Sequence, residues 1–315
     1  MNKKDLRIVF FGTPEFAVES LDALIKNEYN VVGVVTMPDK LAGRGHKLYQ
    51  SDVKRYAIAH DLYIFQPEKL KSEDFLKDLR SLKADLFIVI AFRMLPREVW
   101  QMPRLGTFNL HASLLPKYRG AAPINRAVMN GDSETGVTTF FLKHEIDTGD
   151  MIMQRKIDIN PEDNVGDVHD RLMHLGAEMV VDTVNSIIDG TLTTTPQPEG
   201  NFSPAPKIFK EDCRIDWEKS SIEIHNHVRG LSPYPAAWTI VIEESGRPLE
   251  SKIFQTRLTD ESCSGVTCGT LRIDGKRLLV ACGDNWLEIL SIQPAGKKRM
   301  ATEAFLLGYH PSIMR

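Results

Sequence analysis

The sequence predicts an α/β protein with two domains: a doubly wound, mainly parallel domain at residues 1–189 and a small β-barrel at residues 208–315. A linker at residues 190–207 joins them. Three observations lead to this prediction. Apolar strand-like runs alternate with amphipathic helical patterns in the first half, a threonine- and proline-rich stretch follows, and short strand-like runs separated by glycine-bearing turns fill the second half.

The first element is the apolar run at residues 6–11, which predicts a strand that ends at a glycine. Residues 13–15 then begin a helix, because they supply an N-cap threonine, a proline at the first helical position and an acidic residue in the first turn. A second apolar run at residues 31–35 completes a βαβ unit. A helix at residues 73–82 and a strand at residues 85–91 extend the parallel pattern.

The first turn does not have the sequence of a dinucleotide site. Residues 12–17 read Gly-Thr-Pro-Glu-Phe-Ala and lack the G-x-G-x-x-G spacing that lets the backbone approach a pyrophosphate. Glu15 would also repel a phosphate placed there. The sequence therefore disfavours a nicotinamide-dependent oxidoreductase, although the fold class often serves one.

The second half of the chain changes in character after a long helix. That helix is expected at residues 164–188 and ends before Gly190. After the linker, a short helix is expected near residues 221–229. The main strand-like runs of the barrel are residues 238–242, 278–281 and 287–290.

Composition excludes several classes of protein. No run of about 18 apolar residues occurs and the first residues hold no signal-type apolar region, so we expect a cytoplasmic protein. The four cysteines include no C-x-x-C pair, which argues against a thiolate zinc site and a disulfide scaffold. We expect reduced cysteines, no metal and a monomer.

The charge is spread evenly over the chain. The net charge is −3, and residues 190–315 hold 15 basic and 15 acidic residues. Neither half is therefore a basic nucleic-acid-binding domain by composition alone. Two local basic clusters remain, at residues 40–47 and at residues 297–299, and each can be an RNA contact or ordinary solvated surface.

A polar pair in an apolar strand marks the candidate site. Residues 108–111 read Phe-Asn-Leu-His, so alternation places Asn109 and His111 on one strand face. Asp147 follows in an acidic turn. An amide can hold a developing oxyanion, an imidazole can handle protons near neutral pH, and a carboxylate can stabilise the charged imidazole. A strand histidine and a turn aspartate can each be structural, and it is their combination that predicts acyl transfer without a covalent intermediate.

Longer motifs surround these residues: Asn109-Leu110-His111 with residues 113–116, Arg-Gly-Ala-Ala-Pro at residues 119–123 and Asp-Thr-Gly-Asp-Met at residues 147–151. Together these motifs resemble the signature of the folate-dependent formyltransferase family. Over essentially its whole length the chain is similar to the branch of the family that formylates methionyl-tRNA. Residues 11–14, 38–45 and 290–298 carry that narrower resemblance.

The resemblance implies a fold and a set of functional residues. It implies a Rossmann-like catalytic domain and a carboxy-terminal OB-like barrel that helps to hold tRNA. Asn109, His111 and Asp147 take the catalytic places; Ser113, Leu114, Leu115 and Pro116 take the folate-contacting turn; Arg44 and Lys47 take places in a loop that contacts tRNA.

The reaction that the resemblance implies is transfer of the formyl group of 10-formyltetrahydrofolate to the amino group of methionyl-initiator tRNA, giving N-formylmethionyl-tRNA for translation initiation. The expected partners are thus this tRNA and a reduced folate, with no membrane. The sequence departs from the family pattern in two places, at Phe92-Arg93, where relatives often have Tyr-Gly, and at residues 143–146, which are more charged than usual.

Other interpretations stay open from sequence alone. The same three polar residues would serve a formyltransferase acting on an amino sugar nucleotide, or a hydrolase of formylfolate that uses water. An RNA-binding module without enzymatic activity would explain the barrel but not the polar constellation. His225 and His227 are two apart on a helix and make a poor metal pair, and residues 233–238 can be a rigid connection or a base-stacking surface.

Overall fold

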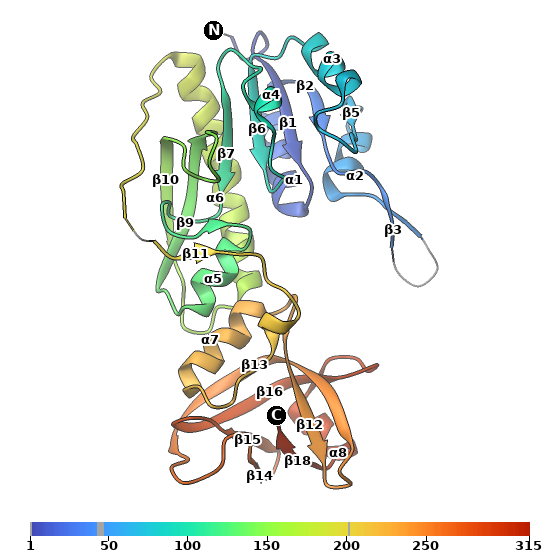
Figure 1. Cartoon of the computed structure of the whole chain (residues 1–315), viewed down its shortest axis with the longest axis vertical. Coiled ribbons are helices and arrows are strands. Elements are labelled where there is room, and N and C mark those ends of the chain that lie inside the picture. Colours follow the sequence, from blue (N-terminus) through green and yellow to red (C-terminus); the bar gives the residue numbers. More distant parts are fainter. Residues whose placement is uncertain (1, 43–46, 201) are drawn as a thin grey trace. The chain divides into compact units, whose positions relative to one another are not determined.

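The computed structural model describes residues 2–42, 47–200 and 202–315, and they form two compact units (Figure 1). The first unit comprises Met1–Gly120, Gly136–Ile157 and His169–Pro204, and the second comprises Ala121–Thr135, Asp158–Val168 and Ala205–Arg315. The units are therefore interleaved along the sequence. The expected boundaries at residues 189 and 208 stay a prediction, because compactness does not establish which segments fold independently.

The first unit is built on a seven-stranded sheet with the order β10-β9-β7-β6-β1-β2-β5 (Figure 1). Its strands are β1 (Arg7–Gly12), β2 (Asn30–Val35), β5 (Ile64–Phe65), β6 (Leu86–Ile90), β7 (Thr107–His111), β9 (Glu134–Phe141) and β10 (Met151–Asp158). Strands β5, β2, β1, β6 and β7 pair in parallel, whereas β9 runs antiparallel to β7. The predicted Rossmann-like, mainly parallel sheet is confirmed.

Three helices of the first unit's sheet region lie close to the residues that the sequence predicted: α1 (Glu15–Lys26), α3 (Glu73–Ser81) and α6 (Val165–Asp189). Two further helices there are α2 (Asp52–Ala59) and α4 (Arg97–Trp100). The sequence analysis did not single out α2, α4 or the hairpin of β3 (Lys40–Ala42) and β4 (Lys47–Tyr49). No helix among the described residues is long and apolar enough to cross a membrane.

Apolar side chains fill both faces of the parallel sheet. On one face, Val9, Phe87 and Val89 join a buried cluster with residues of α3. On the other, α6 approaches β7 closely, since a Cβ added at Gly176 would lie 2.7 Å from Leu110 Cδ2. Leu110 of β7 therefore points toward α6, and its two neighbours in the strand, Asn109 and His111, point away from that helix.

The second unit contains an antiparallel sheet with the order β14-β15-β16-β13-β12-β18. Its strands are β12 (Ala237–Glu243), β13 (Pro248–Ser262), β14 (Leu271–Asp274), β15 (Arg277–Ala281), β16 (Asn285–Pro294), β17 (Met300–Ala301), which pairs with β16, and β18 (Pro311–Met314). The sheet nearly closes on itself, because Gly269, just before β14, accepts a hydrogen bond of 2.8 Å from Met314 N. The predicted small barrel is confirmed.

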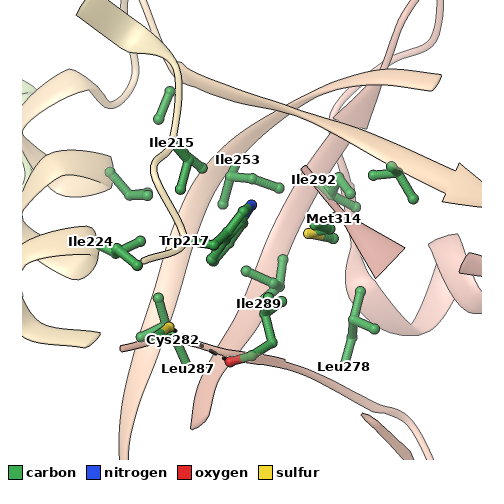
Figure 2. Packing of buried hydrophobic residues seen from close by; sticks show 14 of the residues in the cluster. Ile215, Trp217, Ile224, Ile253, Leu278, Cys282, Leu287, Ile289, Ile292 and Met314 are labelled. Atoms are coloured by element: carbon green, nitrogen blue, oxygen red, sulfur yellow. Dashed lines mark hydrogen bonds between the residues drawn. The ribbon is translucent and has the colours of Figure 1, made fainter. Parts of the chain in front are cut away.

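The interior of the barrel is apolar and includes the indole of Trp217 (Figure 2). Trp217 packs among Ile253, Ile289 and Met314, and its Nε1 donates to Thr239 Oγ1 at 3.0 Å. The second unit also contains three α-helices and one short 3₁₀ helix: α5 (Pro123–Met129), α7 (Ser221–Leu231), α8 (Thr302–Gly308) and η1 (Glu211–Cys213). Two short strands, β8 (Arg119–Gly120) and β11 (Pro204–Ala205), pair with each other.

Two histidines of α7 are expected to make the stability of the second unit sensitive to acid. Burial lowers the pKa of both His225 and His227 below the usual value of 6.5. Well above pH 6.5 the imidazoles are neutral in folded and unfolded chains alike, but as the pH falls through 6.5 the unfolded chain binds more protons, so the free energy of unfolding falls. We expect that fall to approach about 1.4 kcal/mol per pH unit for each histidine that stays neutral.

Denaturant titrations between pH 7.5 and pH 5 measure this dependence. His225 Nδ1 lies 2.9 Å from Thr256 Oγ1, whereas the buried Nε2 of His227 has no hydrogen-bond partner among the described residues. His227→Gln removes one of the two titrating imidazoles and should therefore flatten the acid slope. The exposed His60 provides the control His60→Gln, which should leave the slope unchanged; equal slopes in all three proteins would contradict the assignment.

Candidate active site

The first unit holds all three polar residues that the sequence analysis placed in the catalytic site. Asn109 and His111 lie on β7, and Asp147 lies in the loop between β9 and β10. In the sheet register Asn109 stands between Val89 of β6 and Phe140 of β9, and His111 pairs with Thr138. The pair is thus at the carboxyl end of β7, the edge of a parallel sheet where ligands usually bind.

His111 has both ring nitrogens engaged. The residue is 7% exposed, and its Nε2 lies 2.8 Å from Tyr118 O. Because a carbonyl oxygen only accepts, Nε2 carries the proton of that hydrogen bond. Nδ1 lies 3.7 Å from Asp147 Oδ2. The carboxylate of Asp147 therefore lies where it attracts positive charge on the ring.

Asp147 is positioned from two directions. Its Oδ2 accepts a hydrogen bond of 2.9 Å from Gly120 N, and its backbone oxygen accepts one of 2.8 Å from Gln197 Nε2. The residue has a φ of 54°, in the left-handed region that aspartate tolerates better than most residues. Side chain and backbone together set where the carboxylate faces His111.

The loop that carries Asp147 lies directly against β9. A Cβ added at Gly149 would fall 1.5 Å from Phe141 O, so only glycine fits this position. Phe141 N donates to Asp150 O at 3.1 Å and continues the contact. The Asp-Thr-Gly-Asp motif thus owes its glycine to backbone packing beside the carboxylate.

Asn109 presents an unoccupied carboxamide on the same face as His111. The residue is partly exposed, and no hydrogen bond joins its side chain to any of the residues that the structure describes. Its neighbours in the strand, Phe108 and Leu110, are buried on the opposite face. A free amide donor beside a buried imidazole suits a substrate oxygen that gains negative charge.

The turn expected to contact folate is tightly held within the protein. Ser113 Oγ donates to Lys117 O at 2.7 Å and is buried, as are Leu115 and Pro116. Thr138 Oγ1 donates to Ser113 O at 2.7 Å and accepts from Leu115 N at 3.2 Å. Leu114 is the partly exposed member of the four. The serine hydroxyl shapes the turn, and the folate contact stays a prediction.

The two residues expected to contact tRNA, Arg44 and Lys47, lie in or next to residues 43–46, which the structure does not describe. Arg44 lies outside the described residues. Lys47 begins β4, whose backbone pairs with β3. The two following residues of the hairpin, Leu48 and Tyr49, are 60% and 54% exposed.

Arg93, one of the departures from the family pattern, is bound to backbone. Its guanidinium donates to the carbonyl oxygens of Pro67 and Glu68, the latter at 2.8 Å. Burial lowers the pKa of Arg93. At the second departure, Lys143 pairs with Asp150 at 2.8 Å, on the surface beside the acidic loop.

Sequence reasoning missed three residues that shape this site: Tyr118, Arg119 and Gln197. Arg119 lies inside the Arg-Gly-Ala-Ala-Pro motif that was noted, but Gln197 lies in the segment interpreted as a linker. No local pattern could single it out, because its partners are about 50 and 78 residues away. Among the described residues no group of three or more His, Cys, Asp or Glu side chains is placed to hold a metal ion.

Comparison with known families identifies the architecture. The family model for formyl transferase matches residues 6–184, and that for the formyl transferase C-terminal domain matches residues 207–310. The chain belongs to the formyl transferase family. The predicted family resemblance is therefore confirmed.

Formyl transferase relatives match this chain from end to end. A methionyl-tRNA formyltransferase of Bacteroides fragilis is 56% identical over 98% of this chain and 97% of its own. Those of Flavobacterium johnsoniae and Porphyromonas gingivalis are 52% and 48% identical, over 96% and 98% of this chain and 96% and 97% of their own.

Solved structures, an N-formyltransferase among them, share the fold at lower identity. The N-formyltransferase of Helicobacter canadensis, in complex with folinic acid and dTDP-3-aminofucose, matches with a TM-score of 0.67 and 21% identity over 94% of this chain and 100% of its own. HypX of Aquifex aeolicus, in complex with tetrahydrofolic acid, matches with a TM-score of 0.63 and 19% identity over 96% of this chain and 47% of its own. At these identities the likeness concerns the fold.

Proposed function

We propose that this protein transfers the formyl group of 10-formyltetrahydrofolate to the α-amino group of methionyl-initiator tRNA and so supplies N-formylmethionyl-tRNA for translation initiation. The observation that carries the proposal is the end-to-end match to methionyl-tRNA formyltransferases at 48–56% identity. The arrangement of Asn109, His111 and Asp147 supports it, because it suits transfer to an amine. The proposal places the enzyme in the cytoplasm, as a monomer.

In the proposed reaction, the neutral α-amine of the methionyl group attacks the formyl carbon, a new C–N bond forms, and the bond from that carbon to N10 of the folate breaks. The folate supplies the formyl group on a nitrogen that can leave. The amine loses one proton and N10 gains one, so the reaction needs no other reactant. Negative charge develops on the formyl oxygen as the amine adds.

The catalytic residues have different parts in stabilising that charge. Asn109 donates an amide hydrogen bond to the oxyanion, because its carboxamide makes no other bond to a described side chain. His111 contributes the positive charge of its imidazolium, since its Nε2–H is donated to Tyr118 O at 2.8 Å. Asp147 does not touch the substrate in this mechanism; its negative charge, 3.7 Å from Nδ1 of His111, stabilises positive charge on the imidazole.

The substrates are assigned to two regions. The folate lies at the turn of residues 113–116, and tRNA contacts Arg44, Lys47 and the OB-like barrel of residues 208–315. Phosphate contacts by Arg44 and Lys47 would make tRNA binding weaken as salt increases, in a protein whose net charge is −3.

The contact assigned to Arg44 is tested by Arg44→Ala. We expect a KM for methionyl-tRNA raised about tenfold at low salt, with an unchanged KM for the folate, because one phosphate contact is lost. Lys3→Ala serves as the control, because it also removes one basic side chain from the first unit. A variant that formylates charged tRNA normally would remove Arg44 from the tRNA site.

An acceptor competition tests the function as a whole. The protein is given 10-formyltetrahydrofolate with methionyl-initiator tRNA, methionyl-elongator tRNA, an amino sugar nucleotide or water alone. Preferential formylation of the initiator species supports the proposal. Transfer only to the sugar amine, or release of formate without an acceptor, would keep a formyl-transfer or formyl-hydrolysis site but overturn the tRNA assignment.

A further inference from the structure

The segment after α6 crosses the loop of Asp147 and does not simply connect two domains. Thr195 pairs with Met151 through two backbone hydrogen bonds of 2.8 and 2.9 Å, at the start of β10. Farther along, Tyr118 N donates to Ser203 O at 2.6 Å. Within residues 193–200, all of which are described, Gln197 is the only residue that is not exposed.

The carboxamide of Gln197 is fully used between two parts of the site. Nε2 donates to Asp147 O at 2.8 Å and to Gly149 O at 2.9 Å. Oε1 accepts from Arg119 Nε at 3.1 Å and from an Arg119 terminal nitrogen at 2.6 Å. Its orientation is fixed chemically, because carbonyl oxygens only accept and a guanidinium only donates.

These bonds join the backbone around Asp147 to the strand that binds its carboxylate. Gly120 N donates to Asp147 Oδ2 at 2.9 Å, and Arg119, the preceding residue, is bound to Gln197. Arg119, Gln197 and the loop at residues 147–149 therefore form a closed ring of hydrogen bonds around the carboxylate. We call these three parts the Gln197 clamp.

We propose that the Gln197 clamp positions Asp147 against His111 and so makes Gln197 and Arg119 positioning residues for formyl transfer. The inference rests on the proposed function. The carboxylate acts on the imidazole across 3.7 Å. A displacement of about 1 Å at a catalytic group can lower a rate about 100-fold, so the loop needs a rigid support that its exposed neighbours do not supply.

Substitutions at Gln197 separate the parts of the clamp. Gln197→Leu removes all the hydrogen bonds of this side chain. Gln197→Glu keeps an acceptor for Arg119 but places a carboxylate oxygen, which cannot donate, against the carbonyl oxygens of Asp147 and Gly149. We expect both variants to lower kcat about 10- to 100-fold and to change KM for either substrate less than about threefold. Glu199→Gln, at an exposed position two residues on, is the matched control and should match wild type.

A double-mutant cycle with Asp147→Asn tests whether Gln197 acts through Asp147. If it does, Gln197→Leu lowers kcat in the wild-type background but changes it less than about twofold in the Asp147→Asn background. Equal fold losses in both backgrounds would mean that Gln197 acts elsewhere and would overturn the inference.

Hydrogen exchange provides a readout that does not depend on activity. Gln197→Leu should speed exchange about tenfold or more in peptides spanning residues 117–121 and 142–151, while peptides of β1 and β6 stay as in wild type. Unchanged exchange in the two peptides would overturn the clamp even if the wild-type protein formylates tRNA. Faster exchange in a protein that formylates no tRNA would support the clamp and reject the proposed acceptor, so the two failures are distinguishable.

Discussion

Replacing Asp147 by asparagine is expected to lower the single-turnover rate of formyl transfer about 1,000- to 10,000-fold. The asparagine oxygen can still accept from Gly120 N, so the loop should keep its place. That oxygen is also the atom that faces Nδ1 of His111, so the exchange removes the negative charge 3.7 Å from the ring and no longer stabilises a positive charge on it. The positive charge beside the developing oxyanion would be lost.

Rapid-quench measurements at saturating folate and methionyl-tRNA give this rate. His111→Ala should lose a similar factor, and the double variant should lose little more, since the two residues act as one unit. Asp150→Asn makes the same chemical change three residues away, where the side chain pairs with Lys143 at 2.8 Å, and should cost less than about threefold. If Asp147→Asn performed like Asp150→Asn, the imidazolium would have no part in the reaction.

The second large effect is expected at Asn109. Asn109→Ala should lower the single-turnover rate about 100- to 1,000-fold, the usual loss when one oxyanion donor is removed. KM for either substrate should change little, because the bond strengthens only as charge develops on the formyl oxygen. The variant should remain folded, since this side chain makes no hydrogen bond to the described residues that would be left unpaired.

Asn109→Asp is the companion of this experiment. It keeps the size of the side chain but replaces the donor by a negative acceptor, so it should lose at least as much rate as alanine. A rate within a few-fold of wild type for both variants would show that the oxyanion is stabilised by a different group. A raised KM with an unchanged rate would instead assign Asn109 to substrate binding.

Much of the fold could be predicted because it follows from local pattern. The run at residues 6–11, the proline-started helix after it and the long amphipathic helix appear as β1, α1 and α6, within a residue or two of their predicted bounds. Strands β9 and β10 were not predicted. They add to the sheet beyond β7, where a strand's partner depends on how the whole chain folds back and not on its own periodicity.

The candidate site divides in the same way. By itself, the sequence determined that Asn109 and His111 share a strand face, because side chains alternate along any strand, and its motifs determined the family. Only the tertiary structure decided that His111 Nδ1 faces Asp147 at 3.7 Å, that Nε2 is bonded to Tyr118 O and that Gln197 supports the loop. Those contacts join residues far apart in the chain, and the path of the backbone between them sets such distances, which no local periodicity encodes.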